Sequence, residues 1–232
     1  MANLVIKPAS GSGNKVVFQN QAGNVDAITV EDSGNTTLAG ASNNLGTVTA
    51  GSIAGGSITS ATTFPAGHVI QVVMGTPFTG GEATASTSTS GVDTSVFATI
   101  TPLRSTSDIL VFGSISVGVT LGGAYGGSVW MCRSQAGGET DTRIIVGDGA
   151  GSRTRGTGGI YSDTNNYQHF IIPTLYLDSP TIPASPVAIT YRYKMKSGWS
   201  NSPLLINYGG NDSDGQHATR VSSYITLMEV SG

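Results

Sequence analysis

Aromatic residues are distributed very unevenly along this 232-residue chain. Of its 16 Phe, Trp and Tyr residues, only Phe18 and Phe64 precede Pro65, and the other 14 follow it. A segment without large side chains cannot bury enough apolar surface to offset the entropy lost when its backbone becomes ordered. We therefore expect residues 1–64 to be ordered only by contact with something else, and residues 65–232 to form a domain with its own core.

The composition favours strands over helices. The chain contains 33 Gly, 28 Ser and 28 Thr, which are poor helix formers, and no window shows sustained helical periodicity. The hydrophobic content of 38% and the net charge of −3 argue against a disordered chain. With 11 Lys and Arg against 14 Asp and Glu, the charge balance also argues against a nucleic-acid partner.

Residues 65–232 are predicted to be all-β. The clearest strand is residues 187–195, where Ile189, Tyr191 and Tyr193 face one way while Arg192 and Lys194 face the other. Clusters of Gly, Pro, Asn or Asp separate about nine such runs, which predicts an antiparallel sandwich or jelly roll. The other expected strands are residues 68–74, 96–102, 109–121, 128–133, 143–146, 167–177, 204–208 and 221–230.

The first 64 residues combine short β-prone runs with a five-residue repeat. Gly-Asn pairs at 23–24 and 34–35 separate residues 16–18, 27–30 and 36–38, which predicts a small meander. Val48, Ile53 and Ile58 then recur every five residues, a spacing that gathers them on one side of neither a strand nor a helix. We interpret the repeat as a thin multi-chain shaft with these three side chains at its axis. A flexible Gly/Ser linker is the alternative.

The sequence predicts no enzyme, cofactor or metal site. It contains no phosphate-binding loop, nucleophile elbow or paired-histidine zinc motif, and His68, His169 and His217 lie near three separate strands. Residues 211–215 resemble the middle of a calcium loop, but Gly210 and Val221 would occupy its first and twelfth positions, so a turn is the preferred interpretation. Scattered carboxylates leave a polysaccharide-degrading enzyme as a third, weaker hypothesis.

Two further expectations concern the compartment. The single cysteine, Cys132, lies in an apolar run and is expected to be a buried, inert thiol. No secretory signal and no bilayer-spanning stretch is visible, so we expect synthesis in a cytosol and no membrane insertion.

Aromatic residues in polar loops are the remaining sign of a binding role. Tyr125, Tyr161, Tyr167 and Trp199 lie among small polar residues, a setting that suits contact with sugars or proteins. The alternative is that these rings fold back onto the core or pack at subunit contacts. With neighbouring loop residues, the candidate receptor-binding set is Tyr125, Tyr161, Asn165, Tyr167, Trp199, Asn211 and Asp212.

Several stretches together carry a family resemblance. They are residues 65–73 (PAGHVIQVV), 100–111 (ITPLRSTSDILV), 132–133, 144–148, 153 and 222–230 (SSYITLMEV). These stretches are similar to C-terminal domains of tail-fibre and related appendage proteins of marine tailed bacteriophages. Residues 32–40 (DSGNTTLAG) resemble strand–turn units of fibre shafts.

The resemblance implies a homotrimeric, non-enzymatic virion appendage with a jelly-roll-like head, made in the host cytoplasm. Residues 1–64 would attach to another virion protein (tail, adaptor or collar) and form a short intertwined shaft. Residues 65–232 would contact a host-surface glycan or protein. The alternative is a capsid, collar or neck decorating fibre with a purely structural role.

Overall fold

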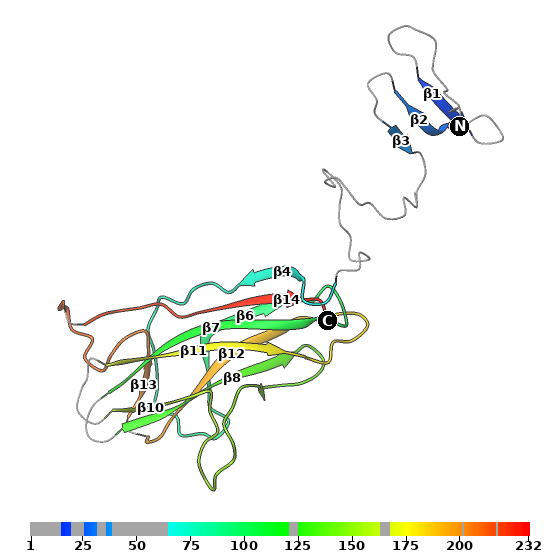
Figure 1. Cartoon of the computed structure of the whole chain (residues 1–232). Coiled ribbons are helices and arrows are strands. Elements are labelled where there is room, and N and C mark those ends of the chain that lie inside the picture. The colour runs from blue at the N-terminus through cyan, green and yellow to red at the C-terminus, as the bar shows by residue number, and fades with distance from the viewer. Residues whose placement is uncertain are drawn as a thin grey trace, which may run out of the picture. The chain divides into compact units, whose positions relative to one another are not determined.

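The computed structural model describes residues 15–19, 26–31, 36–38, 65–120, 125–162, 168–200, 202–216 and 218–232. Every regular element in these ranges is a β-strand, and none of them contains a helix that could cross a bilayer. The prediction of an all-β protein is therefore confirmed for the described residues (Figure 1). Backbone contacts divide the chain into two units, Met1–Ser57 and Ile58–Gly232.

The first unit contains a small antiparallel sheet of order β1-β2-β3. Its strands are β1 (Val16–Gln19), β2 (Asp26–Val30) and β3 (Thr36–Leu38), at the three places where the sequence predicts them. The Gly-Asn turns and the predicted axis residues Val48, Ile53 and Ile58 lie outside the described residues.

The second unit, here called the head, consists of two antiparallel sheets. The first has the order β4-β14-β7-β13-β5, with β11 on the other edge of β7, and the second has the order β10-β8-β12-β6, with β9 beside β8. The bounds are β4 Val69–Met74, β5 Glu82–Thr84, β6 Val92–Ile100, β7 Asp108–Val119, β8 Tyr125–Gln135, β9 Thr142–Arg143, β10 Gly158–Ser162, β11 His169–Asp178, β12 Ile189–Ser197, β13 Leu204–Ile206 and β14 Tyr224–Val230.

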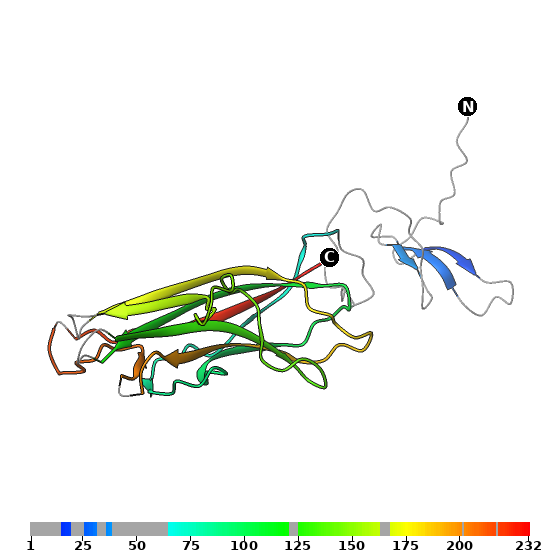
Figure 2. The same cartoon turned by 90° about the horizontal axis from the view of Figure 1, so that it is seen from below.

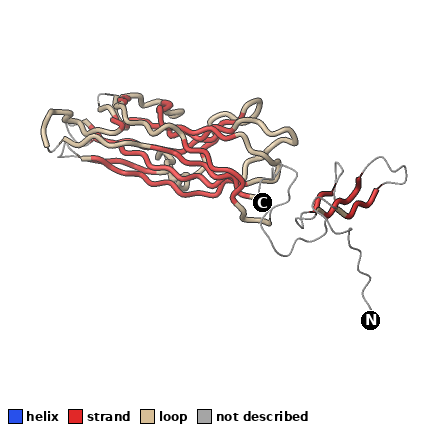
Figure 3. The backbone as a smooth tube through the Cα atoms, turned by 90° about the horizontal axis from the view of Figure 1, so that it is seen from above, coloured by secondary structure: helices blue, strands red, loops and turns tan. Residues whose placement is uncertain are grey.

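The longer strands follow a jelly-roll-like order. One four-stranded layer is β4-β14-β7-β11, and the other is β6-β12-β8-β10. Consecutive strands of this set pass from one layer to the other, except β8 and β10, which pair with each other. This double-sheet arrangement is the jelly-roll form of the antiparallel sandwich. The strands run along the length of the head, with connecting loops at its two ends (Figures 2 and 3).

The core lies between the two layers and consists of the inward residues of each strand. Ile189, Tyr191, Tyr193 and Met195 of β12 are each at most 1% exposed, which confirms the face predicted from their alternation. Each large apolar side chain buried in this way contributes about 1.5–3 kcal/mol relative to exposure.

A buried ion pair joins the two layers. Arg133 of β8 donates two hydrogen bonds from Nη1 to the Asp178 carboxylate at the end of β11, at 2.8 and 2.7 Å. Tyr191 of β12 donates a third, at 2.8 Å, to the same carboxylate. Because burial and the neighbouring Asp178 charge both disfavour a phenolate, the pKa of Tyr191 is raised. This buried polar cluster therefore links the two layers across the core.

A second buried carboxylate organises the loop between β6 and β7. Glu229 of β14 is fully buried and accepts hydrogen bonds from the backbone N–H groups of Leu103 (2.9 Å) and Arg104 (3.2 Å). The Ser107 hydroxyl (2.6 Å) and the Gln71 side chain (2.6 Å) donate to it as well. These bonds tie the loop to strands β4 and β14 at one end of the head.

The structure corrects two of the predicted strands and adds two strands that the sequence does not predict. Residues 143–146 are predicted to be a strand, but the regular ladder with β8 ends at Arg143. The Ile144 N–H still donates to Met131 C=O (3.1 Å), but the Met131 N–H donates to the Thr157 hydroxyl (2.9 Å), so the ladder goes no further. The strand predicted at residues 204–208 ends at Ile206 because Asn207 adopts a left-handed φ of 68°. The sequence pattern does not predict β5 or β10, and the two glycines that begin β10 conceal its strand pattern.

Candidate binding surface

The head has two different ends. The described chain enters the head and leaves it at one end, where the Gly67 N–H donates to Ser231 C=O (2.7 Å) and the Ser231 N–H donates to His68 C=O (2.8 Å). The antiparallel registers place the β7–β8, β10–β11 and β12–β13 connections at the opposite end. We call the first the tether end and the second the distal end.

Three segments meet at the distal end around the start of β8. Tyr161 of β10 pairs with Gly126 of β8, and the Gly198 N–H donates to the Gly126 carbonyl at 2.8 Å from the other side. Gly126 is required here, because a Cβ at this position would collide with the backbone of Ile160. Tyr161 and Trp199 consequently lie on either side of the first residues of β8.

Both of these predicted aromatic residues are exposed. Tyr161 is 58% exposed and Trp199 is 46% exposed, so neither side chain is buried in the core of its own chain. Tyr125 begins β8 beside them, but its side chain lies outside what the structure describes, and so do residues Asn165 and Tyr167. Of the four aromatic candidates, only Tyr161 and Trp199 have side chains that the structure describes, and both lie beside the start of β8.

Asn211 and Asp212 belong to the connection between β13 and β14. This connection leaves β13 beside Ser116 and extends to the distal end, where its orange-to-red trace is visible in Figure 1. Asn211 is half-buried, whereas Asp212 accepts a hydrogen bond from Arg220 Nε at 2.9 Å and forms an ion pair with that guanidinium. Arg220 also stacks over Tyr208, 5.6 Å from the ring centre.

This arrangement bears on the calcium-like string at residues 211–215. The carboxylate of Asp212 is paired with an arginine, and no group of three His, Cys, Asp or Glu side chains in the described ranges could hold a metal ion.

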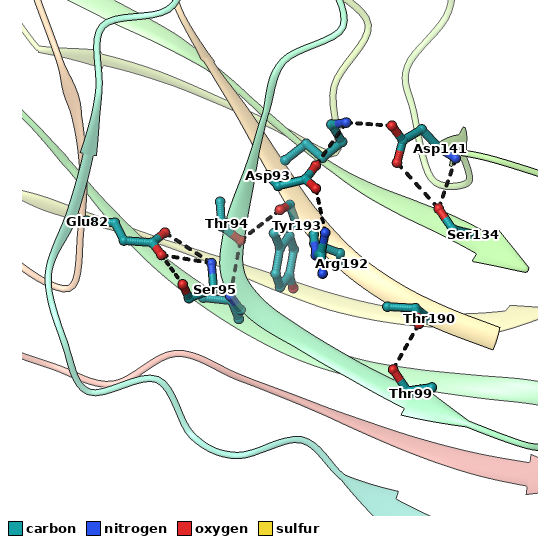
Figure 4. Close-up of polar contacts among 12 residues, drawn as sticks. Glu82, Asp93, Thr94, Ser95, Thr99, Ser134, Asp141, Thr190, Arg192 and Tyr193 are labelled. Carbon is teal, nitrogen blue, oxygen red and sulfur yellow. Dashed lines mark hydrogen bonds and ion pairs between the residues drawn. The ribbon is translucent and has the colours of Figure 1, made fainter. Parts of the chain in front are cut away.

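Charged side chains on the outer face of the β6–β12–β8 layer neutralise one another (Figure 4). Lys194 lies between Asp93 Oδ1 (3.0 Å) and Asp141 Oδ2 (2.6 Å), and Arg192 pairs with Asp93. Burial alone would lower the pKa of Lys194, but the two carboxylates raise it, so the ammonium stays charged. These ion pairs hold Lys194 in place on the outer face of the layer.

The outer face of the other layer was not anticipated from the sequence. β11 reads as a nearly continuous apolar run, Phe170-Ile171-Ile172-Pro173-Thr174-Leu175-Tyr176-Leu177, instead of alternating with polar residues. A continuous run is the mark of a strand covered on both faces, yet Ile171 and Leu175 are 66% and 64% exposed. The continuous apolar run is therefore the one sequence signal that could have indicated this surface.

Comparisons with known proteins are sparse. No protein-family model matches the chain, and no curated protein matches it. Solved structures that resemble it include those of the infectious bursal disease virus Gt and Gx strains, each at 13% sequence identity. The matches cover 70% of this chain but only 38% and 37% of those chains, with TM-scores of 0.30 and 0.25. Similarity this low carries no argument about function, and the fold is assigned from strand order and register.

Proposed function

We propose that the chain is a structural protein of a virion appendage, similar to a tail fibre, whose head contacts the host surface. In this proposal residues 1–64 attach to another virion protein and help to join three copies. The observation that carries the proposal is the polarity of the head: the chain is tethered at one end, and exposed Tyr161 and Trp199 lie at the other.

The chemistry of the distal end supports a binding role. Aromatic rings next to small polar residues offer a rigid apolar surface together with hydrogen-bonding groups, which suits glycans and protein surfaces. Three such ends on each appendage, and several appendages on each particle, would turn weak individual contacts into stable attachment. The pairing of Arg133 and Lys194 with carboxylates favours binding over catalysis, because these cations are already committed.

Cell binding tests the proposal. Fluorescently labelled full-length protein would be incubated with a panel of marine bacterial strains, beside the double variant Tyr161→Ala/Trp199→Ala. A matched control is Leu103→Ala, because Leu103 is 50% exposed but lies in the loop held by Glu229 at the tether end. We expect the double variant to lose about tenfold or more in affinity and the control to keep wild-type affinity.

Two results would overturn the adhesive part. One is wild-type protein that binds no strain better than an unrelated trimeric protein does. The other is equal binding by wild type and the double variant, with unchanged thermal midpoints showing that both are folded. Immunogold labelling of particles would then distinguish a decorating protein of the capsid, collar or neck from a tail component.

A further inference from the structure

The outward side chains of four neighbouring strands form one apolar surface. The registers align Met74, Thr226, Phe112 and Leu175 in one row across β4, β14, β7 and β11. The adjacent row consists of Val72, Met228, Leu110 and Leu177. Seven of these eight residues are apolar and the eighth is threonine. We call this surface the apolar face.

These residues are exposed in the single chain. The apolar residues on this side that are at least 42% exposed are Val69, Val72, Met74, Phe112, Ile171, Leu175, Leu177 and Tyr224. At roughly 100 Å² each, these eight side chains offer on the order of 800 Å² of apolar surface. The largest apolar patch on a typical monomer is about 300–600 Å², so this face is larger than an isolated soluble domain usually exposes.

The other layer of the same head provides an internal comparison. Its outward positions include Asp93 and Ser95 on β6, Arg192 and Lys194 on β12, and Ser134 on β8. The close-up in Figure 4 shows Arg192 ion-paired with Asp93, Ser95 hydrogen-bonded to Glu82, and Ser134 hydrogen-bonded to Asp141. A two-layer sandwich that meets water on both sides should have two faces of this kind. Only one of its two outer faces is polar. This difference indicates that another surface covers the apolar face in the assembled protein.

Two observations indicate what covers it. No charged residue occupies an outward position from Leu110 to Ser116 on β7 or from Ile171 to Leu177 on β11, so copies of this face that pack together around a shared axis bury no unpaired charge there. An area of roughly 800 Å² per partner is what a standard stable interface buries, and interfaces between identical subunits are the more apolar class.

The edge strand β11 argues for face contact rather than strand addition. Pro173 lies in the middle of β11 and has no backbone N–H to donate. Proline in an edge strand disfavours pairing with a strand from another molecule. The remaining way to cover the exposed side chains of β11 is to pack another surface against them.

We infer that the apolar face is the surface through which heads of this chain pack against one another in an oligomer. The inference rests on the proposed multi-copy appendage and extends it, because it locates an interface within the head in addition to the predicted shaft. It commits to a second copy of this chain as the partner.

The rate at which hydrogen peroxide oxidises Met74 shows whether another copy of the chain covers the apolar face. Met74 is 64% exposed in the single chain, whereas Met131 and Met195 are at most 1% exposed and serve as internal references. The full-length protein would be oxidised, digested and analysed by mass spectrometry, with its solution mass measured by light scattering. The same measurements would be made on Leu175→Asp, which places a charge in the row of Met74, and on Leu103→Asp. Leu103 is a leucine that is 50% exposed in the loop between β6 and β7, outside the two rows, and provides the matched control.

We expect wild type to be oligomeric and its Met74 to be oxidised about fivefold or more slowly than in Leu175→Asp. Leu103→Asp should behave as wild type. A shaft that holds the copies together would keep the mass of Leu175→Asp high, but its Met74 would still become reactive. Equal rates for Met74 in wild type and Leu175→Asp would overturn the inference, and so would a monomeric wild type with fully reactive Met74.

The outcome is separable from that of the proposed function. Protein that binds bacteria while its Met74 is freely oxidised contradicts the interface and leaves the adhesive role standing. Protein with a protected Met74 that binds no strain supports the interface and contradicts adhesion.

Discussion

The hydroxyl of Tyr193 lies against Gly113, which belongs to the opposite layer of the head. A Cβ at Gly113 would be 2.5 Å from that oxygen, so the missing side chain leaves the space into which the phenol fits. The same hydroxyl donates a hydrogen bond to Thr174 Oγ1 at 2.7 Å. Strands β7, β11 and β12 are thus joined through one buried tyrosine and one glycine.

Replacing Gly113 by alanine should destabilise the head. The added methyl group must displace the Tyr193 ring or break its hydrogen bond, and overpacking of this kind costs about 1–3 kcal/mol. Urea unfolding followed by tryptophan fluorescence measures the change. Gly159→Ala is the control, because no atom lies within 4 Å of a Cβ at that strand position. Equal effects of the two substitutions would contradict this account of the packing.

Asp178→Asn should be among the most destabilising conservative changes in the chain. It removes the charge that Arg133 and Tyr191 both contact, and breaking a buried ion pair costs about 3–5 kcal/mol. Asp93→Asn is the comparison, because the Asp93 side chain is 50% exposed and a surface pair contributes at most about 1 kcal/mol. Similar losses of unfolding free energy for both variants would contradict the claim that the buried Asp178 cluster stabilises the head more than a surface ion pair does.

Stability should fall in acid partly through Glu139. The hydrogen bond from Arg133 lowers the pKa of Glu139 below its ordinary value of 4.5. A lowered folded-state pKa stabilises the protein above that ordinary value, and the contribution is lost as the pH falls through the folded-state pKa. Because Glu139 is 46% exposed, the contribution is at most about 1 kcal/mol. Urea midpoints at pH 7, 5 and 3 should decline less in Glu139→Gln, and parallel pH curves would refute the assignment.

The Cys132 thiol should be unreactive in the folded protein. It is 2% exposed, and burial together with the nearby Asp141 charge raises its pKa to about 11. At pH 8 only about one thiol in a thousand would then be ionised, and the thiolate is the reactive form. An aromatic disulfide reagent should therefore label native protein far more slowly than urea-unfolded protein. Comparable labelling rates in the two states would show that the site opens readily.

The sequence was sufficient to predict strands whose alternation reflects a single buried face. The inward face of the strand predicted at residues 187–195 is confirmed because Tyr191 and Tyr193 must both point into the core while Arg192 points away, although the strand itself runs from Ile189 to Ser197. The sequence was not sufficient where a glycine stands at a position whose side chain would have shown the inward–outward alternation. Gly158, the first residue of β10, is an example: a Cβ there would lie 2.7 Å from Ile172 Cδ1. The need for a glycine at this position becomes visible only when β10 and β11 are placed in the fold.

The candidate surface was predictable only in part. The exposed loop aromatics Tyr161 and Trp199 stand out in the sequence because small polar residues surround them. The apolar face does not, since it is assembled from four strands distant in sequence, and Met74 lies in line with Leu175 only through the registers of β14 and β7. Those registers are long-range properties of the fold, which local patterns do not contain.

Assembly is the central claim, and the solution mass of the full-length protein tests it most directly. Light scattering during size-exclusion chromatography, repeated over a wide range of loading concentrations, would measure it against the chain mass of 23.6 kDa. We predict three times that mass, unchanged on dilution. A dimer would be compatible with the apolar face but not with a trimeric appendage. A stable monomer at every concentration would contradict both.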